Sequence, residues 1–152
     1  NSPALPKPAQ QPRPPVIIGG GGPKRTPALA ARFADEFNVA FADIDTAVTQ
    51  FGRVRDACMA IDRDPSSLSR STAQVLCVGR DDAELAKRAA FIGRGVDELR
   101  TGGLAGTPAE VVDTIGAWRE RTGVRRIYLQ VLDLQDLDHI ELVAAEVVPQ
   151  LS

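Results

Sequence analysis

The sequence predicts an α/β fold in which parallel β-strands alternate with α-helices. Short apolar runs recur along the chain, separated by segments whose apolar residues step by three and four positions. Residues 75–78 form an unbroken apolar run, which is typical of a parallel strand covered on both faces. Capping residues, glycines and prolines stand at the borders between these segments. Such alternation requires parallel strands joined by right-handed crossovers.

We expect four strands, at residues 16–18, 36–41, 72–78 and 126–131, the first of them fully buried. Thr26 and Pro27 should open a helix that ends near residue 35, and Asp45 should cap a second helix that ends at 64–65. Residues 81–84 should open a third helix, whose apolar stripe runs from residue 85 to 99.

The segment at 101–106 is predicted to be a glycine-rich break. Thr107 and Glu110 form a capping box for a helix that Gly123 ends, and a final helix should begin near Asp136. The expected order is therefore β-α-β-α-β-α-α-β-α. It fits either a small doubly wound sheet or half of a (β/α)8 barrel, because a complete barrel needs about 250 residues. In a half-barrel the first and last strands would be open edges that something must cover.

The composition is that of one globular domain: 152 residues, 43% hydrophobic and 25% charged. A net charge of -2 and 5% aromatic residues argue against nucleic acid as a partner. No apolar run approaches the length of a membrane span and no signal-peptide pattern opens the chain, so no membrane partner is expected. Cys58 and Cys77 form no CxxC pair, which indicates reduced core thiols in a cytoplasmic protein and no metal site.

Six prolines lie within residues 1–15, so this segment is predicted to be an extended lead-in to a domain at residues 16–152. The first residue is Asn1, which suggests that the chain is part of a longer protein.

A glycine run carries the strongest chemical signal in the chain. Gly19, Gly20, Gly21 and Gly22 follow the first strand, and Lys24 and Arg25 come directly before the expected helix. Glycines let a ligand approach the main chain, and successive N–H groups near a helix start form a concave anion site. The pattern predicts a phosphate or diphosphate as the ligand.

Two better-known glycine motifs fit this run less well. A P-loop needs Gly-Lys-Ser/Thr, but Pro23 precedes Lys24 here, and Arg25 follows it. A dinucleotide fingerprint would place a third glycine where Lys24 stands. A plain flexible turn remains the structural alternative, although a turn needs fewer than four glycines.

The glycine run with residues 24–38, together with residues 106–112 and 123–130, resembles the luciferase-like monooxygenase superfamily. Within it, these stretches are most similar to the branch of oxidoreductases that use the deazaflavin coenzyme F420. The resemblance runs from about residue 12 to 151. It implies the C-terminal half of a TIM (β/α)8 barrel, with the four strands as the barrel's fifth to eighth.

The resemblance also implies roles for individual residues. Gly19 to Gly22 would bind the cofactor phosphate through main-chain N–H groups, and Lys24 and Arg25 would neutralise charge on it. Asn38 and Gln130, near the ends of their strands, would line the pocket. Asn38 could equally be a polar residue that finishes a strand, and Lys24 or Arg25 could be solvated surface cations. His139 is expected to have a surface role. The catalytic residues stay unknown, because the family's first four strands have no counterpart in the chain.

The implied activity is hydride transfer between F420 and a small organic substrate. One alternative is a monooxygenase that uses flavin mononucleotide (FMN), since both cofactors present a phosphate. Another is a non-catalytic half-barrel that binds a phosphorylated ligand. The resemblance also suggests a homodimer for the full-length protein, and this chain alone is expected to be inactive.

Overall fold

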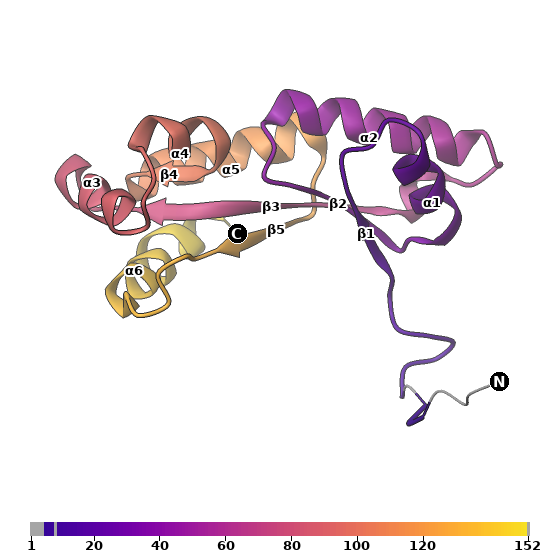
Figure 1. Ribbon diagram of the computed structural model, residues 1–152, viewed down its shortest axis with the longest axis horizontal. Helices are drawn as coiled ribbons and strands as arrows, with labels where there is room; N and C mark the ends of the chain where they lie inside the picture. Colours follow the sequence, from indigo (N-terminus) through magenta and orange to yellow (C-terminus); the bar gives the residue numbers. More distant parts are fainter. Residues whose placement is uncertain (1–4, 8, 152) are drawn as a thin grey trace.

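A computed structural model describes residues 5–7 and 9–151 of the chain (Figure 1). Its strands and helices follow in this order: β1 (Ile17–Gly19), α1 (Arg25–Phe33), β2 (Glu36–Ala40), α2 (Ile44–Met59), β3 (Ser69–Val78), α3 (Asp82–Phe91), α4 (Val96–Gly102), β4 (Leu104–Gly106), α5 (Pro108–Thr122), β5 (Arg126–Gln130) and α6 (Leu137–Leu142). A π-helical turn, Val143–Val147, and a 3-10 turn, Val148–Gln150, continue α6.

All five strands lie in one parallel sheet, which confirms the predicted α/β class. The strands β1, β2, β3 and β4 are neighbours in that order, and β5 pairs with β3. The long strand β3 is central: its first half pairs with β2 on one side, up to Ala40 opposite Ala73, and with β5 from Ser71 to Val75. Its last three residues pair with β4.

Strand β4 lies inside the segment that was predicted to be a glycine-rich break, so that prediction was incomplete. The strand has only three residues, with Leu76 opposite Leu104, and its pairing depends on the far end of β3. Gly103 lets the chain pass close to β3, because a Cβ there would lie 2.8 Å from the carbonyl oxygen of Val75. Three residues are too few to show the alternation of apolar and polar side chains that predicts a strand. The pairing of β4 depends on a partner that is distant in the sequence.

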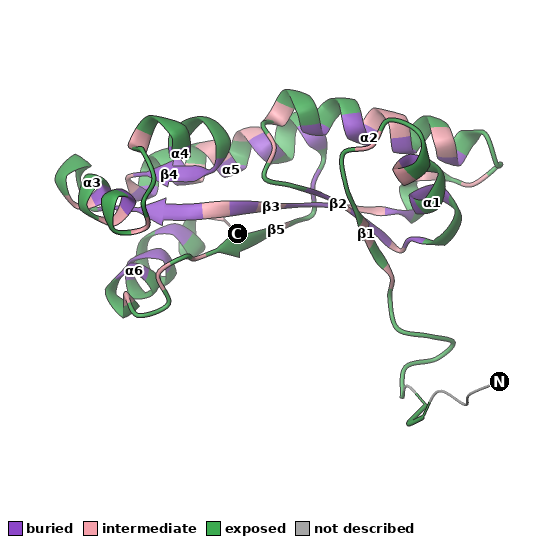
Figure 2. Cartoon of the chain, in the orientation of Figure 1, coloured by how far each residue is buried: buried purple, intermediate pink, exposed green. Residues whose placement is uncertain are grey.

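The main core lies between the sheet and helices α1, α2 and α5. In β2, Phe37 and Val39 are buried in this core, and Phe37 meets Phe51 of α2 edge to face at 6.0 Å between ring centroids. The alternate residues Glu36 and Asn38 point to the opposite face. Figure 2 shows β1 and β5 as largely exposed, whereas β3 is buried along most of its length.

The first strand is therefore not fully buried, contrary to expectation. Ile17 is 49% exposed, because β1 is an edge strand and Ile17 lies on the side that no helix covers. A run of apolar residues cannot distinguish a central strand from an edge strand. The prediction of buried, unbridged thiols is confirmed for Cys58 and Cys77, and burial raises the pKa of both thiols above its usual value.

Several helix borders differ from the predicted ones. Helix α1 begins at Arg25, so Thr26 is its second residue and not its cap, and Lys24 holds the cap position without a side-chain hydrogen bond. Helix α2 is capped by Asp43, whose carboxylate accepts from the Thr46 N–H, and not by Asp45. The predicted capping box of Thr107 and Glu110 is confirmed, and the helices expected to begin near residues 81 and 136 are capped by Asp81 and Asp136.

The predicted third helix is two helices. Its apolar stripe continues from Leu85 to Leu99, but Gly93 adopts a left-handed conformation at φ +69° and separates α3 from α4. Both helices pack their stripe on Cys77 and Ala105, which form a second, smaller core at the end of β3. The stripe was identified correctly, but the bend within it was missed.

The proline-rich lead-in contains no helix or strand at residues 5–7 and 9–15. Residues 1–4 and 8, which belong to the same lead-in, lie outside the described part. Arg13 pairs with Asp35, and Asp35 also accepts from the Val16 N–H at 2.7 Å, which ties the lead-in to the end of α1. Within the described residues, no helix has both the length and the apolar character needed to cross a membrane.

Candidate functional site

Gly19 ends β1, and Gly20, Gly21 and Gly22 begin the connection from β1 to α1, at the carboxyl edge of the parallel sheet. In barrels of parallel strands this edge is where ligands bind. Gly20 has φ +137°, a conformation that a residue with a side chain rarely adopts. The other three glycines have ordinary φ values. At Gly22 a Cβ would lie 3.0 Å from the Thr26 hydroxyl oxygen, so the loop passes close to the first turn of α1.

The loop's polar main-chain groups divide into two sets. The Gly21 carbonyl faces the protein, where it accepts a hydrogen bond from Gln50 Nε2 of α2 at 2.8 Å. The N–H groups of Gly21 and Gly22 donate to no acceptor among the residues that the structure describes. Gly21 is exposed and Gly22 is partly exposed. The loop thus presents free donors on its outer side.

The start of α1 is electrostatically unlike the starts of the other described helices. Helices α2 to α6 each have an acidic residue in the first turn, whereas α1 has none and also lacks a side-chain cap. Lys24 and Arg25 stand at this position, and neither makes an ion pair within the described part of the chain. The positive end of the α1 dipole is therefore left uncompensated beside the glycines.

Asn38 lies next to the glycine run, because it is the register partner of Gly19. Its side-chain amide is engaged within the sheet, where Nδ2 donates to Ser71 Oγ at 2.9 Å, and Ser71 in turn donates to Glu36 at 2.6 Å. The buried Glu36 carboxylate also accepts from Tyr128 and Arg126 of β5. The structure thus brings Asn38 to Gly19 but directs its amide into a network on the uncovered face.

Gln130 ends β5 opposite Val75 and lines a cavity of about 450 Å³. Phe41, which follows β2, lines the same cavity, and it has φ +53° although it is not a glycine. Such strained positions concentrate at functional sites. None of the four glycines lines this cavity, so the structure does not bring Gln130 into direct contact with the glycine run.

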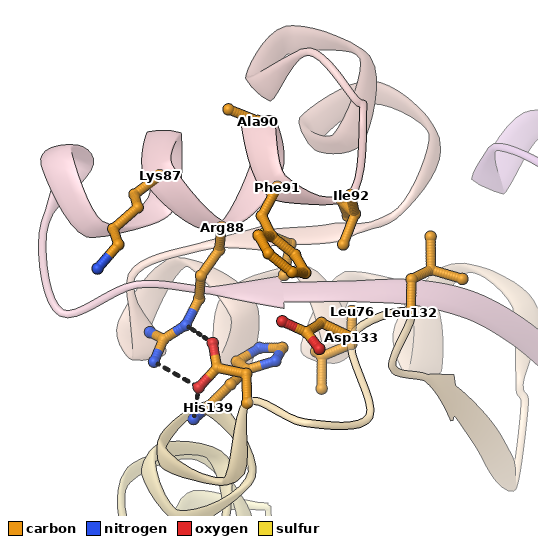
Figure 3. A pocket seen from close by; sticks show the side chains of 11 residues that line it. Leu76, Lys87, Arg88, Ala90, Phe91, Ile92, Leu132, Asp133 and His139 are labelled. Carbon is orange, nitrogen blue, oxygen red and sulfur yellow. Dashed lines mark hydrogen bonds and ion pairs between the residues drawn. The ribbon is translucent and has the colours of Figure 1, made fainter.

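A larger cavity, of about 540 Å³, lies between α3 and α6 (Figure 3). Its apolar lining includes Phe91 at the end of α3, Ile92 directly after it, Leu76 of β3 and Leu132, and His139 and Asp133 add polar groups. The glycine run does not line it either. Main-chain N–H groups can bind an anion at the surface and need no deep hollow, so the loop does not depend on this cavity to hold one.

His139 corrects a prediction, since it is not a surface residue. It is only 4% exposed, and its Nε2 atom accepts a hydrogen bond from the Val78 N–H at 2.9 Å. Burial, together with the Arg88 charge, lowers the pKa of His139 below its ordinary value. The imidazole is therefore neutral and holds α6 against the end of β3. Its place in the first turn of a helix gave no sign of this tertiary contact.

Arg88 is a second residue that sequence reasoning missed. Its side chain is 10% exposed and forms ion pairs with Glu84, Asp136 and Asp138, at 2.9, 2.7 and 2.8 Å. It also donates to the carbonyl oxygen of Val78 at 2.9 Å. The network joins α3 to α6 beside the larger cavity. Among the described residues, no group of three or more His, Cys, Asp or Glu side chains is arranged to hold a metal ion.

Comparison with known proteins identifies the family of this chain. The family model described as luciferase-like monooxygenase matches residues 2–101. Comparison with curated proteins found no significant match.

Three solved structures illustrate the likeness in fold. The coenzyme F420 dependent tetrahydromethanopterin reductase from Methanopyrus kandleri has a TM-score of 0.73 and 16% identity, over 91% of this chain and 51% of that chain. The EDTA monooxygenase from Chelativorans sp. BNC1 has a TM-score of 0.74 and 18% identity, over 91% and 44%. The oxygenating constituent of 3,6-diketocamphane monooxygenase from Pseudomonas putida, in complex with FMN, has a TM-score of 0.67 and 16% identity, over 92% and 50%.

At these identities the likeness establishes the fold. The chain spans about half the length of the solved structures that it matches, in agreement with half of a (β/α)8 barrel. The family match covers most of the sequence, including the glycine run and the start of α1. This chain therefore belongs to the luciferase-like monooxygenase family.

Proposed function

We propose that this chain is the cofactor-binding half of an F420-dependent oxidoreductase that transfers a hydride between the deazaflavin and a small organic substrate. The observation that carries the proposal is the glycine loop. Its outward N–H groups, at Gly21 and Gly22, have no acceptor in the described chain and stand beside the uncompensated start of α1. A phosphate matches this arrangement in charge and in hydrogen bonding.

The loop suits the phosphate of such a cofactor on physical grounds. Each hydrogen bond from an N–H group to a charged oxygen contributes about 1.5–3 kcal/mol. The main chain is open to a ligand at Gly21, because a Cβ added there would lie 4.0 Å from its nearest neighbour, Gln50 Nε2, on the inner side. Lys24 and Arg25 would neutralise the charge of the phosphate, or of further acidic groups attached to it.

The reaction itself would be supplied by the bound cofactor, because a reduced deazaflavin donates a hydride and an oxidised one accepts it. The chain's own residues would bind and orient. Gly19 and Asn38 would form the floor beside the phosphate, since they are paired across β1 and β2. Gln130 and Phe41 would bound the separate cavity of about 450 Å³ and limit the shape of a substrate there.

FMN is the second candidate cofactor. One of the similar structures holds FMN, another is described as F420 dependent, and both cofactors carry a phosphate that the loop could bind. Titration of the complete protein with each cofactor separates the two possibilities. Tight quenching of F420 fluorescence with weak FMN binding supports the proposal, and the reverse preference would replace it with a flavin-dependent monooxygenase.

The loop is tested by substitution of Gly21 with valine. We expect affinity for the preferred cofactor to fall at least about tenfold, equivalent to about 1.4 kcal/mol, because the branched side chain would press on Gln50 and displace the main chain that is proposed to bind the phosphate. Gly116→Val is the control, since Gly116 lies in the exposed part of α5 with nothing within 4 Å of its Cβ position. Equal cofactor affinity in both folded variants would contradict the phosphate site.

A further inference from the structure

We infer that Gln50 of α2 is a positioning residue that orients the Gly21–Gly22 peptide for phosphate binding. The inference rests on the proposed function, because it assigns a role toward the same phosphate. Gln50 would not touch the ligand. It would act through the main chain of the loop.

Gln50 lies in the middle of α2, between the core and the glycine run. Its side chain is buried, with 5% of the residue exposed, and Nε2 donates to the Gly21 carbonyl oxygen at 2.8 Å. Its other polar atom, Oε1, is buried and has no partner among the described residues. A buried amide with one unsatisfied atom destabilises the fold. A hydrophobic residue would avoid this cost, which points to a use for the single bond that is made.

That use follows from the geometry of a trans peptide. The six atoms of the unit are nearly coplanar, and the C=O and N–H bonds point in opposite directions. The Gly21 carbonyl is held toward α2, so the Gly22 N–H in the same peptide points away from α2. This N–H donates to no described residue. Gln50 thus fixes the direction of one of the donors that the proposed phosphate requires.

The chemistry of the side chain matters for this role. Glutamate has nearly the same shape, but its carboxylate oxygen would repel the Gly21 carbonyl. Asparagine is one methylene shorter and would not reach from the same position. Methionine fills a similar volume without a donor, so Gln50→Met removes the bond and leaves packing largely intact.

Gln74 provides a matched control within the same fold. It is 1% exposed, its Nε2 donates to the Ala42 carbonyl at 2.9 Å, and its Oε1 is also buried without a partner among the described residues. It lies on β3 and contacts the segment between β2 and α2, not the glycine run. Gln74 Nε2 also donates to Thr72 Oγ1 at 3.0 Å, so Gln74→Met removes the same kind of buried amide donor, with two hydrogen bonds, at a position with no proposed role.

The experiment measures binding of phosphorylated and dephosphorylated cofactors to the complete protein by fluorescence titration. The pairs are F420 with its dephosphorylated chromophore, and FMN with riboflavin. We expect Gln50→Met to weaken binding of the preferred phosphorylated cofactor about tenfold and to leave its dephosphorylated partner within about twofold. Gln74→Met should lower the melting temperature to a comparable extent and leave all affinities unchanged.

The outcomes separate the two proposals. If the unmodified protein binds the phosphorylated and dephosphorylated forms equally, the phosphate site is wrong and the role of Gln50 fails with it. If the unmodified protein prefers the phosphorylated form and Gln50→Met keeps that preference in full, the phosphate site stands and the role of Gln50 is wrong. An equal loss for both forms also overturns that role, because it indicates general loosening.

A second measurement needs no folded Gln50 variant. Protein labelled with ¹⁵N-glycine gives an NMR signal for the amide of each glycine. The signal of Gly22 is the one that is missing from the spectrum of a Gly22→Ala variant. On addition of the preferred phosphorylated cofactor, the Gly22 signal should shift strongly, and the dephosphorylated partner should leave it nearly in place. A Gly22 signal that does not respond to the phosphorylated cofactor overturns the inference.

Discussion

Single residues in this chain owe their roles to partners far away in the sequence. His139 accepts a hydrogen bond from the N–H of Val78, which lies 61 positions away in the sequence. The charged groups around it come from two elements, with Arg88 and Glu84 on α3 and Asp133 and Asp136 before α6. Its neutral form is needed for the hydrogen bond, because a protonated imidazole has no free acceptor atom. The stability of the fold should therefore depend on the protonation of this residue.

We predict that the free energy of unfolding falls as the pH falls below about 6.5, the ordinary pKa of histidine. The unfolded chain takes up a proton in that range, whereas the folded chain resists it until its lowered pKa is reached. His139→Gln should keep an acceptor for Val78 without titrating, so its unfolding free energy should change less between pH 7 and 5. Denaturant unfolding of both proteins measures this. Because His139 is the only histidine in the sequence, equal pH slopes would contradict the assignment.

At the scale of elements, the residues in the first turn of each helix distinguish α1 from the other helices. Helices with an acidic first turn are neutralised by their own residues, whereas α1 is left open beside the glycine run. Helices α3 and α6 are connected to each other by ion pairs. Arg88 connects α3 with the start of α6 through Asp136 and Asp138, on the edge of the cavity of about 540 Å³. This connection should dominate the packing of α6.

Arg88→Met is predicted to destabilise the protein by about 3 kcal/mol, because it leaves the partly buried Asp136 carboxylate without its cation. Arg80→Met is the control. Arg80 also pairs with Glu84 and Asp138, but its side chain is 48% exposed, so its loss should cost clearly less stability than the loss of Arg88. Chemical denaturation of the two variants gives the comparison. If both variants lose a similar amount of unfolding free energy, the buried position of Arg88 contributes no more than a surface ion pair does.

At the scale of the whole molecule, the sheet is covered on one face and open on the other. The open face carries the hydrogen-bonded set of Glu36, Ser71 and Arg126, and its edge strands β1 and β5 each pair with one described strand. Ile17 on β1 and Leu129 on β5 are 49% and 40% exposed. In a complete barrel both edges would pair with further strands. An edge left free invites pairing with another chain.

We predict that this 152-residue chain, produced alone, self-associates through its two edges. Lysine at both Ile17 and Leu129 should shift it toward the monomer, because charged side chains on edge strands oppose pairing. Light scattering after size-exclusion chromatography measures the mass of each form. Lysine at the exposed Met59 of α2 serves as the control and should leave association unchanged. A chain that is monomeric at all concentrations would contradict the prediction.

Much of the fold could be predicted from local pattern. Alternating apolar runs and amphipathic stripes identified the parallel α/β class. The Thr107 cap and the helix starts near residues 81 and 136 were placed correctly, because a cap bonds to residues within three positions of itself. What failed depended on distant partners. Strand β4 needs the end of β3, and the exposure of Ile17 depends on which strand is at the edge.

The candidate site divides in the same way. The sequence by itself determined the glycine run, its cationic neighbours and the resemblance to a family that the comparison then established. Only the tertiary structure decided that Gln50 holds the Gly21 carbonyl, that Asn38 bonds to Ser71 and that His139 is buried. Composition and spacing are properties of neighbouring residues, and so a sequence displays them directly. The direction of a peptide and the burial of a side chain are set by contacts across 29 to 61 positions, which form only when the sheet and its helices assemble.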